Sequence, residues 1–248
     1  MPRFEYRALP PLNTAFSEVY FLVHCILADC VKRTSYGVRA EDCFGLVGAS
    51  GAGKTSTFDI ITGLRFANDG HVFIGNQYVN STQGIGYCPQ FDAMLPRLSC
   101  RLNMTIIAGL IGYRYPEKVV EEMLRFLELQ QHANKAFGRC SGGQRRRISI
   151  GVALLNPSKL VILDEPTAGI DPKTRHRVWA LLQAVRISGR ALLLSSHSME
   201  ECEAICSRIG ILVKGRLTAI GPSQALKTMY VLFMCYIISP NDVLPDTK

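Results

Sequence analysis

The sequence predicts a three-layer α/β fold in which helices cover both faces of a mainly parallel sheet. Three short apolar runs have the length and composition of buried strands, namely residues 43–47, 160–163 and 191–194. Between them lie segments in which apolar residues recur at helical spacing, as in Phe58, Ile61 and Leu64. With 248 residues and 48% hydrophobic content, the chain is long enough for one sizeable globular domain.

A glycine-rich segment follows the first apolar run. It reads Gly-Ala-Ser-Gly-Ala-Gly-Lys-Thr and matches G-x-x-x-x-G-K-[ST] at every fixed position, between a predicted strand and a predicted helix. Its backbone N–H groups can approach an anion closely. We expect Lys54 along the β- and γ-phosphates and the Thr55 hydroxyl on Mg²⁺. An ordinary glycine-rich turn is the alternative. The segment predicts ATP or GTP binding by Gly48, Ala49, Ser50, Gly51, Ala52, Gly53, Lys54 and Thr55.

Two carboxylates, Asp164 and Glu165, follow the apolar run 160–163. Ligands of α/β sheets bind at the carboxyl ends of the strands. Asp164 suits Mg²⁺ ligation and Glu165 suits polarising an attacking water. Acidic residues also follow strands simply to open a turn. The pair is informative because it accompanies a phosphate-binding loop.

A second anion-binding helix start is predicted at Ser141, Gly142 and Gly143. Apolar residues then continue at helical spacing through Ile148, Val152 and Leu155. The domain therefore has two predicted phosphate sites.

These elements, taken in order, resemble the nucleotide-binding domain of an ATP-binding-cassette (ABC) transporter. The resemblance adds Gln90, Asp171 and His197, and it covers residues 31–228. The segments 85–93 and 195–204 are similar to the second cassette of subfamily A lipid exporters. The segment 140–144 corresponds to the signature motif of the family and departs from its usual sequence. Cys140 stands where the wider family usually has Leu and where second cassettes of subfamily A usually have Tyr, and Gln144 stands where those second cassettes usually have Asn.

The resemblance implies roles for the added residues. Gln90 corresponds to the glutamine that senses Mg²⁺ and couples to the membrane domain, and His197 to the side chain that contacts the γ-phosphate and attacking water. Without the resemblance, Gln90 would be interpreted as an ordinary polar loop residue, and His197 as a histidine that caps a helix or lies at the edge of the core. Asp171 can also start a helix whose first residue is Pro172. The resemblance assigns further nucleotide contacts to Ser56, Gln144 and Asp171.

The resemblance also implies an antiparallel β lobe and an inserted helical lobe at about 91–139. The helical lobe contains a predicted amphipathic helix after Pro116, with Val119, Met123, Phe126 and Leu127 on its apolar face. In the segment 1–30, Tyr20 resembles the aromatic residue that stacks on adenine, and a core tyrosine is the alternative. We expect residues 229–248 to be a divergent tail.

Composition points to a reducing compartment. The nine cysteines are odd in number and include no Cys-x-x-Cys pair, which favours free thiols over disulfides or a zinc site. The longest apolar stretches, 20–27 and 229–238, are well short of the ~20 residues that span a bilayer. No secretory signal is expected. The net charge of +8 is dispersed except at Arg145–Arg147, which we expect to be a solvated helix face, with no dedicated nucleic-acid binding.

Helix starts and helix faces are also predicted near the C-terminus. Ser198 and Glu201 form a capping-box pattern, and Cys202 and Cys206 fall on one helix face, where they are expected to be core residues.

We therefore expect an ATP-hydrolysing motor domain of a membrane exporter on the cytoplasmic face of a membrane. It would pair head-to-tail with a second cassette and contact transmembrane domains through the helical lobe. A soluble ABC ATPase acting on DNA or ribosomes is the alternative. DNA-repair types need a long heptad insertion between Gln90 and Ser141, and none is present. A nonhydrolysing regulatory cassette is disfavoured because Lys54, Asp164, Glu165 and His197 are all there.

Overall fold

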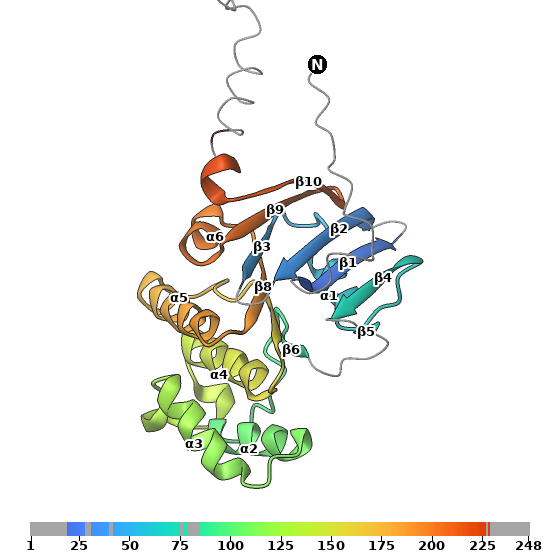
Figure 1. Ribbon diagram of the computed structural model, residues 1–248. Helices are drawn as coiled ribbons and strands as arrows, with labels where there is room; N and C mark the ends of the chain where they lie inside the picture. Colours follow the sequence, from blue (N-terminus) through green and yellow to red (C-terminus); the bar gives the residue numbers. More distant parts are fainter. Residues whose placement is uncertain are drawn as a thin grey trace, which may run out of the picture.

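The computed structural model describes residues 19–27, 31–39, 42–74, 77–78, 85–226 and 228. Within them the chain forms a six-stranded sheet and a four-stranded sheet, with helices packed around the larger one (Figure 1). The strands are β1 (Val19–Leu27), β2 (Val31–Arg39), β3 (Cys43–Val47), β4 (Asp69–Ile74), β5 (Gln77–Tyr78), β6 (Ile85–Cys88), β7 (Leu160–Asp164), β8 (Ala191–Ser196), β9 (Arg208–Val213) and β10 (Arg216–Gly221). The helices are α1 (Lys54–Ile61), α2 (Cys100–Ile111), α3 (Pro116–Phe126), α4 (Gly142–Leu155), α5 (Pro172–Ile187) and α6 (Met199–Ile205), with 3-10 turns at Gln130–His132 and Phe137–Arg139.

The larger sheet has the strand order β10-β9-β3-β8-β7-β6. All its pairs are parallel except the β9–β10 hairpin. β3, β7 and β6 therefore present their carboxyl ends at one edge, where the predicted site residues follow them in the chain. The predicted strands at 43–47, 160–163 and 191–194 are confirmed, and so is the α/β fold.

The smaller sheet is antiparallel, in the order β2-β1-β4-β5. This sheet corresponds to the antiparallel β lobe that the family resemblance implies. The pairing of β1 with β2 is irregular between Val19 and Phe21, so Tyr20 lies at this irregularity.

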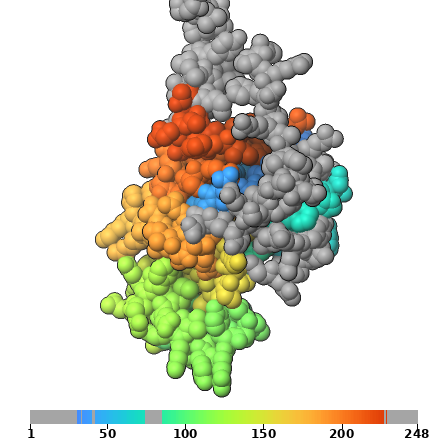
Figure 2. Space-filling view, viewed as in Figure 1, coloured from blue at the N-terminus to red at the C-terminus, as the bar shows by residue number. Residues whose placement is uncertain are grey.

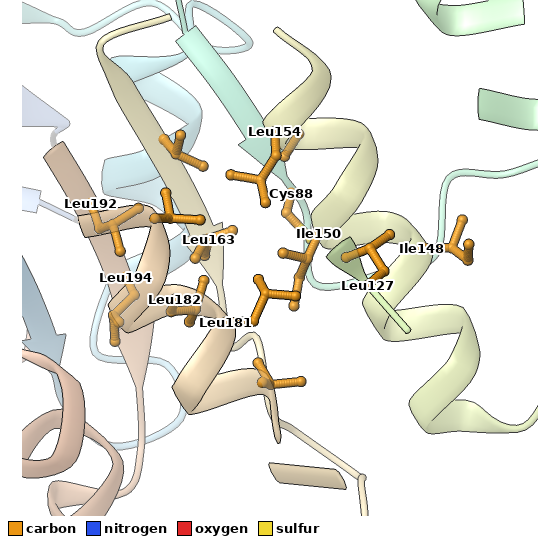
Figure 3. Close-up of a cluster of buried hydrophobic side chains, with 14 of the residues drawn as sticks. Cys88, Leu127, Ile148, Ile150, Leu154, Leu163, Leu181, Leu182, Leu192 and Leu194 are labelled. Atoms are coloured by element: carbon orange, nitrogen blue, oxygen red, sulfur yellow. The ribbon is translucent and has the colours of Figure 1, made fainter. Parts of the chain in front are cut away.

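The two faces of the larger sheet bury two separate apolar clusters. One face packs on α4, α5, α6 and the helical segment; the other packs on α1 and the antiparallel sheet. Figure 3 shows part of the first cluster, to which α4 contributes Ile150 and Leu154, β7 contributes Leu163 and α5 contributes Leu182. Burial on both faces explains why the parallel strands are continuous apolar runs. The layers are therefore helices, central sheet, and α1 with the antiparallel sheet.

Helices α2 and α3 form a lobe beside α4, at the opposite end of the molecule from β9 and β10 (Figures 1 and 2). The predicted apolar face of α3 is partly wrong, because Val120 and Leu124 are buried while Phe126 is 45% exposed. Leu64 was also predicted on a helix face, but α1 ends at Ile61 and Leu64 is exposed. In α3 the buried stripe is centred on Val120 and Leu124 and leaves Phe126 at its edge, whereas Leu64 is exposed because it lies beyond the end of α1.

Six described cysteines are free and buried, as expected: Cys43, Cys88, Cys100, Cys140, Cys202 and Cys206. Burial raises the pKa of the Cys88 thiol to about 11 and that of Cys100 to about 12, the latter also through its hydrogen bond with Cys140.

None of the helices in the described ranges is long and apolar enough to cross a membrane. Residues 1–18 and 229–248, part of the predicted N-terminal segment and the predicted tail, lie outside the described residues.

Candidate nucleotide site

The glycine-rich loop runs from the end of β3 to the start of α1. Gly51 and Gly53 have φ of 78° and 101°, a left-handed conformation that favours glycine. A Cβ on Gly48 would lie 2.5 Å from the carbonyl oxygen of Leu212, so this position excludes larger residues. A Cβ on Gly51 would meet no atom within 4 Å, because the loop is open there. The glycines thus shape a concave backbone segment ahead of the N-terminus of α1.

Lys54 is the first residue of α1, and it is only 5% exposed. Its Nζ donates to the carbonyl oxygens of Gly48 at 2.8 Å and Ala49 at 3.1 Å, and it lies 3.6 Å from Oε1 of Glu165. The ammonium group of Lys54 therefore lies between the backbone of the glycine-rich loop and the carboxylate of Glu165. Thr55 and Ser56 follow on α1, with Thr55 exposed and Ser56 partly exposed.

The Glu165 carboxylate lies among three predicted site residues. Its Oε2 accepts a hydrogen bond from Nε2 of Gln90 at 3.2 Å and lies 3.6 Å from Nδ1 of His197. Its Oε1 faces Lys54. Residues that are 75 and 32 positions apart from it in the chain thus meet at one carboxylate, because β6, β7 and β8 are neighbours in the sheet. Glu165 itself has a φ of 47°, an uncommon conformation for a residue with a side chain.

Asp164 ends β7 and is fully buried. Its Oδ1 accepts a hydrogen bond from the Ser195 hydroxyl, which in turn accepts one from the Glu165 amide at 2.9 Å. Oδ2 of Asp164 is buried and has no hydrogen-bond partner among the described residues. A buried carboxylate oxygen without a partner is costly, and it suits a cation ligand or an ordered water.

Ser141 caps the N-terminus of α4. Its Oγ accepts from the Gln144 amide at 3.3 Å, and Oε1 of Gln144 accepts from the Ser141 amide at 3.0 Å. This reciprocal capping box leaves Gly142 exposed at the helix start, and a Cβ there would meet no atom within 4 Å. No hydrogen bond or ion pair among the described residues joins Ser141 or Gln144 to Lys54 or Glu165. The second predicted phosphate site is therefore separate from the first within one chain.

Asp171 caps α5, and its Oδ1 accepts from the Thr174 amide at 3.0 Å. Hydrogen bonds from Thr174 lower the pKa of this carboxyl below its usual range. Thr174 also lies against Gly143, where a Cβ would be 2.6 Å from the threonine methyl. Gly143 is therefore needed for the close approach of α4 and α5 near their starts.

Two of the three consecutive arginines contradict the predicted solvated face. Arg146 and Arg147 are 5% and 7% exposed, whereas Arg145 is partly exposed and lies 3.4 Å from Asp92. Nη1 of Arg147 donates to the carbonyl of Leu127 at 2.8 Å, and Arg146 donates to the loops after β6 and β7. The sequence carried no signal for this burial, because the carbonyl partners come from distant segments.

Glu201 is a buried residue near the site whose contacts the sequence did not predict. Ser198 does cap α6 through the Glu201 amide, but the reciprocal half of the predicted capping box is absent. The Glu201 carboxyl is buried and instead accepts from the hydroxyls of Thr167 and Ser196, both at 2.6 Å. It links the segment after Glu165 to the residue before His197.

The structure thus brings together Lys54, Gln90, Asp164, Glu165 and His197 at the sheet edge. Tyr20 lies in β1, but its side chain lies outside the described residues, so its predicted adenine contact is untested.

Comparison with known proteins agrees with this geometry. The sequence profile of the family described as ABC transporter matches residues 31–168. The chain is 50% identical over 201 residues to "ABC transporter ced-7" of Caenorhabditis elegans, which covers 81% of this chain and 12% of that protein. It is 42% identical over 228 residues to "Phospholipid-transporting ATPase ABCA3" of Homo sapiens, covering 89% and 13%, respectively. The chain therefore spans about an eighth of the length of these relatives.

Solved structures share the fold at lower sequence identity. The ADP conformation of MJ1267, an ATP-binding cassette of an ABC transporter, superimposes with a TM-score of 0.76 at 21% identity, covering 89% of this chain and 98% of that one. A dimeric post-hydrolysis state of the cassette MJ0796, bound to ADP and Pi, gives a TM-score of 0.74 at 23% identity, covering 82% and 98%. Because the family profile covers more than half of the chain and the curated relatives are 50% and 42% identical over most of it, the chain belongs to the ABC transporter family.

Proposed function

We propose that this chain binds and hydrolyses MgATP as the motor domain of a lipid exporter. The observation that carries the proposal is the position of the Glu165 carboxylate, which contacts Lys54, Gln90 and His197 at once. A carboxylate held by a phosphate-binding lysine, an amide donor and a histidine is suited to orient a water for attack on a γ-phosphate.

The residues present fit the Mg²⁺ that accompanies ATP. Within the part of the chain that the structure describes, Oδ2 of Asp164 is a buried oxygen without a hydrogen-bond partner, and Thr55 is exposed at the start of α1. Together with Gln90 these residues offer the oxygen ligands that Mg²⁺ prefers. When bound, the ion would neutralise charge on the phosphate oxygens. The glycine loop, whose N–H groups precede α1, would hold the phosphates themselves.

In hydrolysis, Glu165 polarises the attacking water and His197 helps to hold it. Lys54 and the loop amides stabilise charge that develops on the γ-phosphate. The Lys54–Glu165 ion pair of 3.6 Å implies that the arriving phosphate competes with Glu165 for the ammonium. That exchange would free the carboxylate to face water only when nucleotide is present.

A second cassette would complete each site in a head-to-tail pair. The helix start at Ser141, Gly142 and Gly143 supports this, because Ser141 and Gly142 are exposed and a Cβ on Gly142 would meet no atom within 4 Å. Gln144 and Asp171 lie close to the same helix start. The dimeric state of the MJ0796 cassette supports the same pairing.

We further propose that the cassette comprises residues 31–228, with the helical lobe at about 91–139 as its contact with transmembrane domains. Leu102, Ile106 and Leu110 of α2 are exposed at i, i+4 and i+8, and Phe91 and Leu95 are exposed in the preceding loop. Such a stripe fits an apolar partner segment. Docking there would place the chain on the cytoplasmic face of a membrane. Relatives named as phospholipid-transporting ATPases support a lipid substrate.

The variant Glu165→Gln tests the proposal, with Glu122→Gln on the exposed surface of α3 as the matched control. We expect MgATP binding to persist while hydrolysis falls about 10²–10⁴-fold, the usual contribution of a positioned base. Binding and turnover should be measured with a partner cassette supplied. Equal loss of binding and turnover would instead assign Glu165 a structural role.

A further inference from the structure

We propose that Arg146 is a positioning residue for hydrolysis, which holds the loop carrying Gln90 and the loop carrying Glu165 at a fixed separation. The inference deepens the proposed function and rests on it. Arg146 lies in the second turn of α4 and contacts neither substrate-binding side chains nor a carboxylate oxygen; its partners are all backbone carbonyls.

The first set of contacts holds the loop after β6. Nη1 of Arg146 donates to the Pro89 carbonyl at 2.6 Å and approaches the Gln90 carbonyl at 3.4 Å. These bonds fix the backbone from which the Gln90 side chain reaches Glu165. The Gln90 side chain is exposed, so its position depends on this backbone anchor.

The second set holds the loop after β7. Nη2 donates to the carbonyls of Asp164 and, at 3.1 Å, of Glu165, while Nε donates to the Pro166 carbonyl at 3.1 Å. Glu165 occupies a left-handed φ of 47°, which persists only where surrounding contacts determine it. Three consecutive carbonyls bound by one side chain supply such contacts.

Among the side chains, only arginine has the donor geometry to make both sets of hydrogen bonds, those to the loop after β6 and those to the loop after β7. A guanidinium presents five N–H groups in a rigid planar fork, whereas a lysine ammonium is a single point with three rotatable donors. Because the side chain is 5% exposed, water cannot readily replace the bonds it makes. Removing it would leave the carbonyls of two loops without this shared donor, and the Gln90–Glu165 contact of 3.2 Å would lose its support.

The contacts also tie α4, whose start is the second predicted phosphate site, to the loops that carry Gln90 and Glu165. Arg146 is five residues after Ser141 on the same helix, so the start of α4 is tied to the catalytic loop of its own chain. A shift of either loop would be transmitted to the helix start that faces a partner cassette.

Arg146→Gln tests this role, and Arg125→Gln on the exposed surface of α3 is the matched control, since Arg125 lies outside both loops. We expect Arg146→Gln to lower kcat about 10–100-fold, because displacement of a catalytic group by ~1 Å has an effect of that size. The KM for ATP should change less than about 3-fold, since Lys54 and the glycine loop are untouched. Arg146→Lys should restore kcat only in part.

A second readout needs no turnover. Hydrogen–deuterium exchange of the nucleotide-free chain should accelerate in peptides covering residues 88–92 and 164–168 in Arg146→Gln and stay unchanged in Arg125→Gln. If Arg146→Gln does not fold, Arg146→Lys decides in its place.

Three results would overturn the proposal: kcat equal to that of Arg125→Gln, exchange unchanged in both peptides, or failure of both Arg146 variants to fold, which would make the residue purely structural. If the unsubstituted chain with its partner hydrolyses no ATP while the exchange result is as expected, the proposed function fails and the positioning of the two loops stands.

Discussion

Nζ of Lys54 lies 3.6 Å from Oε1 of Glu165, so the residue predicted to bind phosphate forms an ion pair with the residue predicted to activate water. Both side chains are largely shielded from solvent, which makes their interaction stronger than that of a surface pair. Lys54 is also bound to the Gly48 and Ala49 carbonyls, so its position is set before nucleotide arrives.

Lys54→Ala is therefore expected to abolish stabilisation of the chain by MgATP. In the unsubstituted chain, a nucleotide concentration of 100 times Kd should stabilise the fold by about 2.7 kcal/mol. Thermal unfolding with and without MgATP measures the difference. Lys118→Ala, on the exposed surface of α3, should retain the full shift. An unchanged shift in Lys54→Ala would remove the phosphate-site assignment.

Ser141→Arg is expected to prevent nucleotide-dependent pairing without preventing ATP binding. A bulky cation at the start of α4 would fill the space intended for the phosphate of a partner's ATP, while Lys54 lies outside its contacts. Sedimentation in the Glu165→Gln background, with and without MgATP and with a partner cassette, measures the pairing. Thr218→Arg adds the same charge on exposed β10 and should pair normally. Normal pairing by Ser141→Arg would contradict the assignment of the second phosphate site.

Glu201→Gln is expected to lower the free energy of unfolding by about 1–3 kcal/mol. Its carboxyl accepts from two buried hydroxyls, those of Thr167 and Ser196, and an amide has only one oxygen to offer them. Denaturant unfolding checks this. The exposed neighbour Glu200→Gln should change stability by less than about 0.5 kcal/mol. Equal effects of the two changes would show that the hydroxyl bonds contribute little.

Alkaline pH is expected to destabilise the chain through the Cys88 thiol. Burial raises its pKa from 9.0 to about 11, so the folded state holds its proton more tightly than the unfolded state. This stability contribution is complete below pH 9 and is lost as pH rises toward 11, at about 1.4 kcal/mol per pH unit. Cys88→Ala should therefore show a shallower decline of unfolding free energy over that range. Parallel declines in the two proteins would contradict the link to this thiol.

Much of the candidate site was predictable because its residues follow local rules. The glycine-rich motif at 48–55 predicts a strand before it and a helix from its end, as the structure has them, and Ser141, Asp171 and Ser198 cap helices through bonds to amides three residues away. The buried positions of α5, Val178, Leu182 and Val185, likewise follow from spacing along a single helix.

The partners of Arg146 and Glu201 were not predictable in this way. A run of three arginines on a helix is usually solvated, and two of them are buried here because carbonyls of the loop after β6, of β7 and of the C-cap of α3 accept their hydrogen bonds. The same holds for Phe126, whose exposure depends on how α3 packs.

The sequence by itself determined the loop, the carboxylate pair, the helix caps and the strands, since each depends on residues adjacent in the chain. The tertiary structure decided that Gln90, Glu165 and His197 meet and that Arg146 holds two of their loops. Those contacts require the parallel order β8-β7-β6, in which strands far apart in sequence end side by side at one edge.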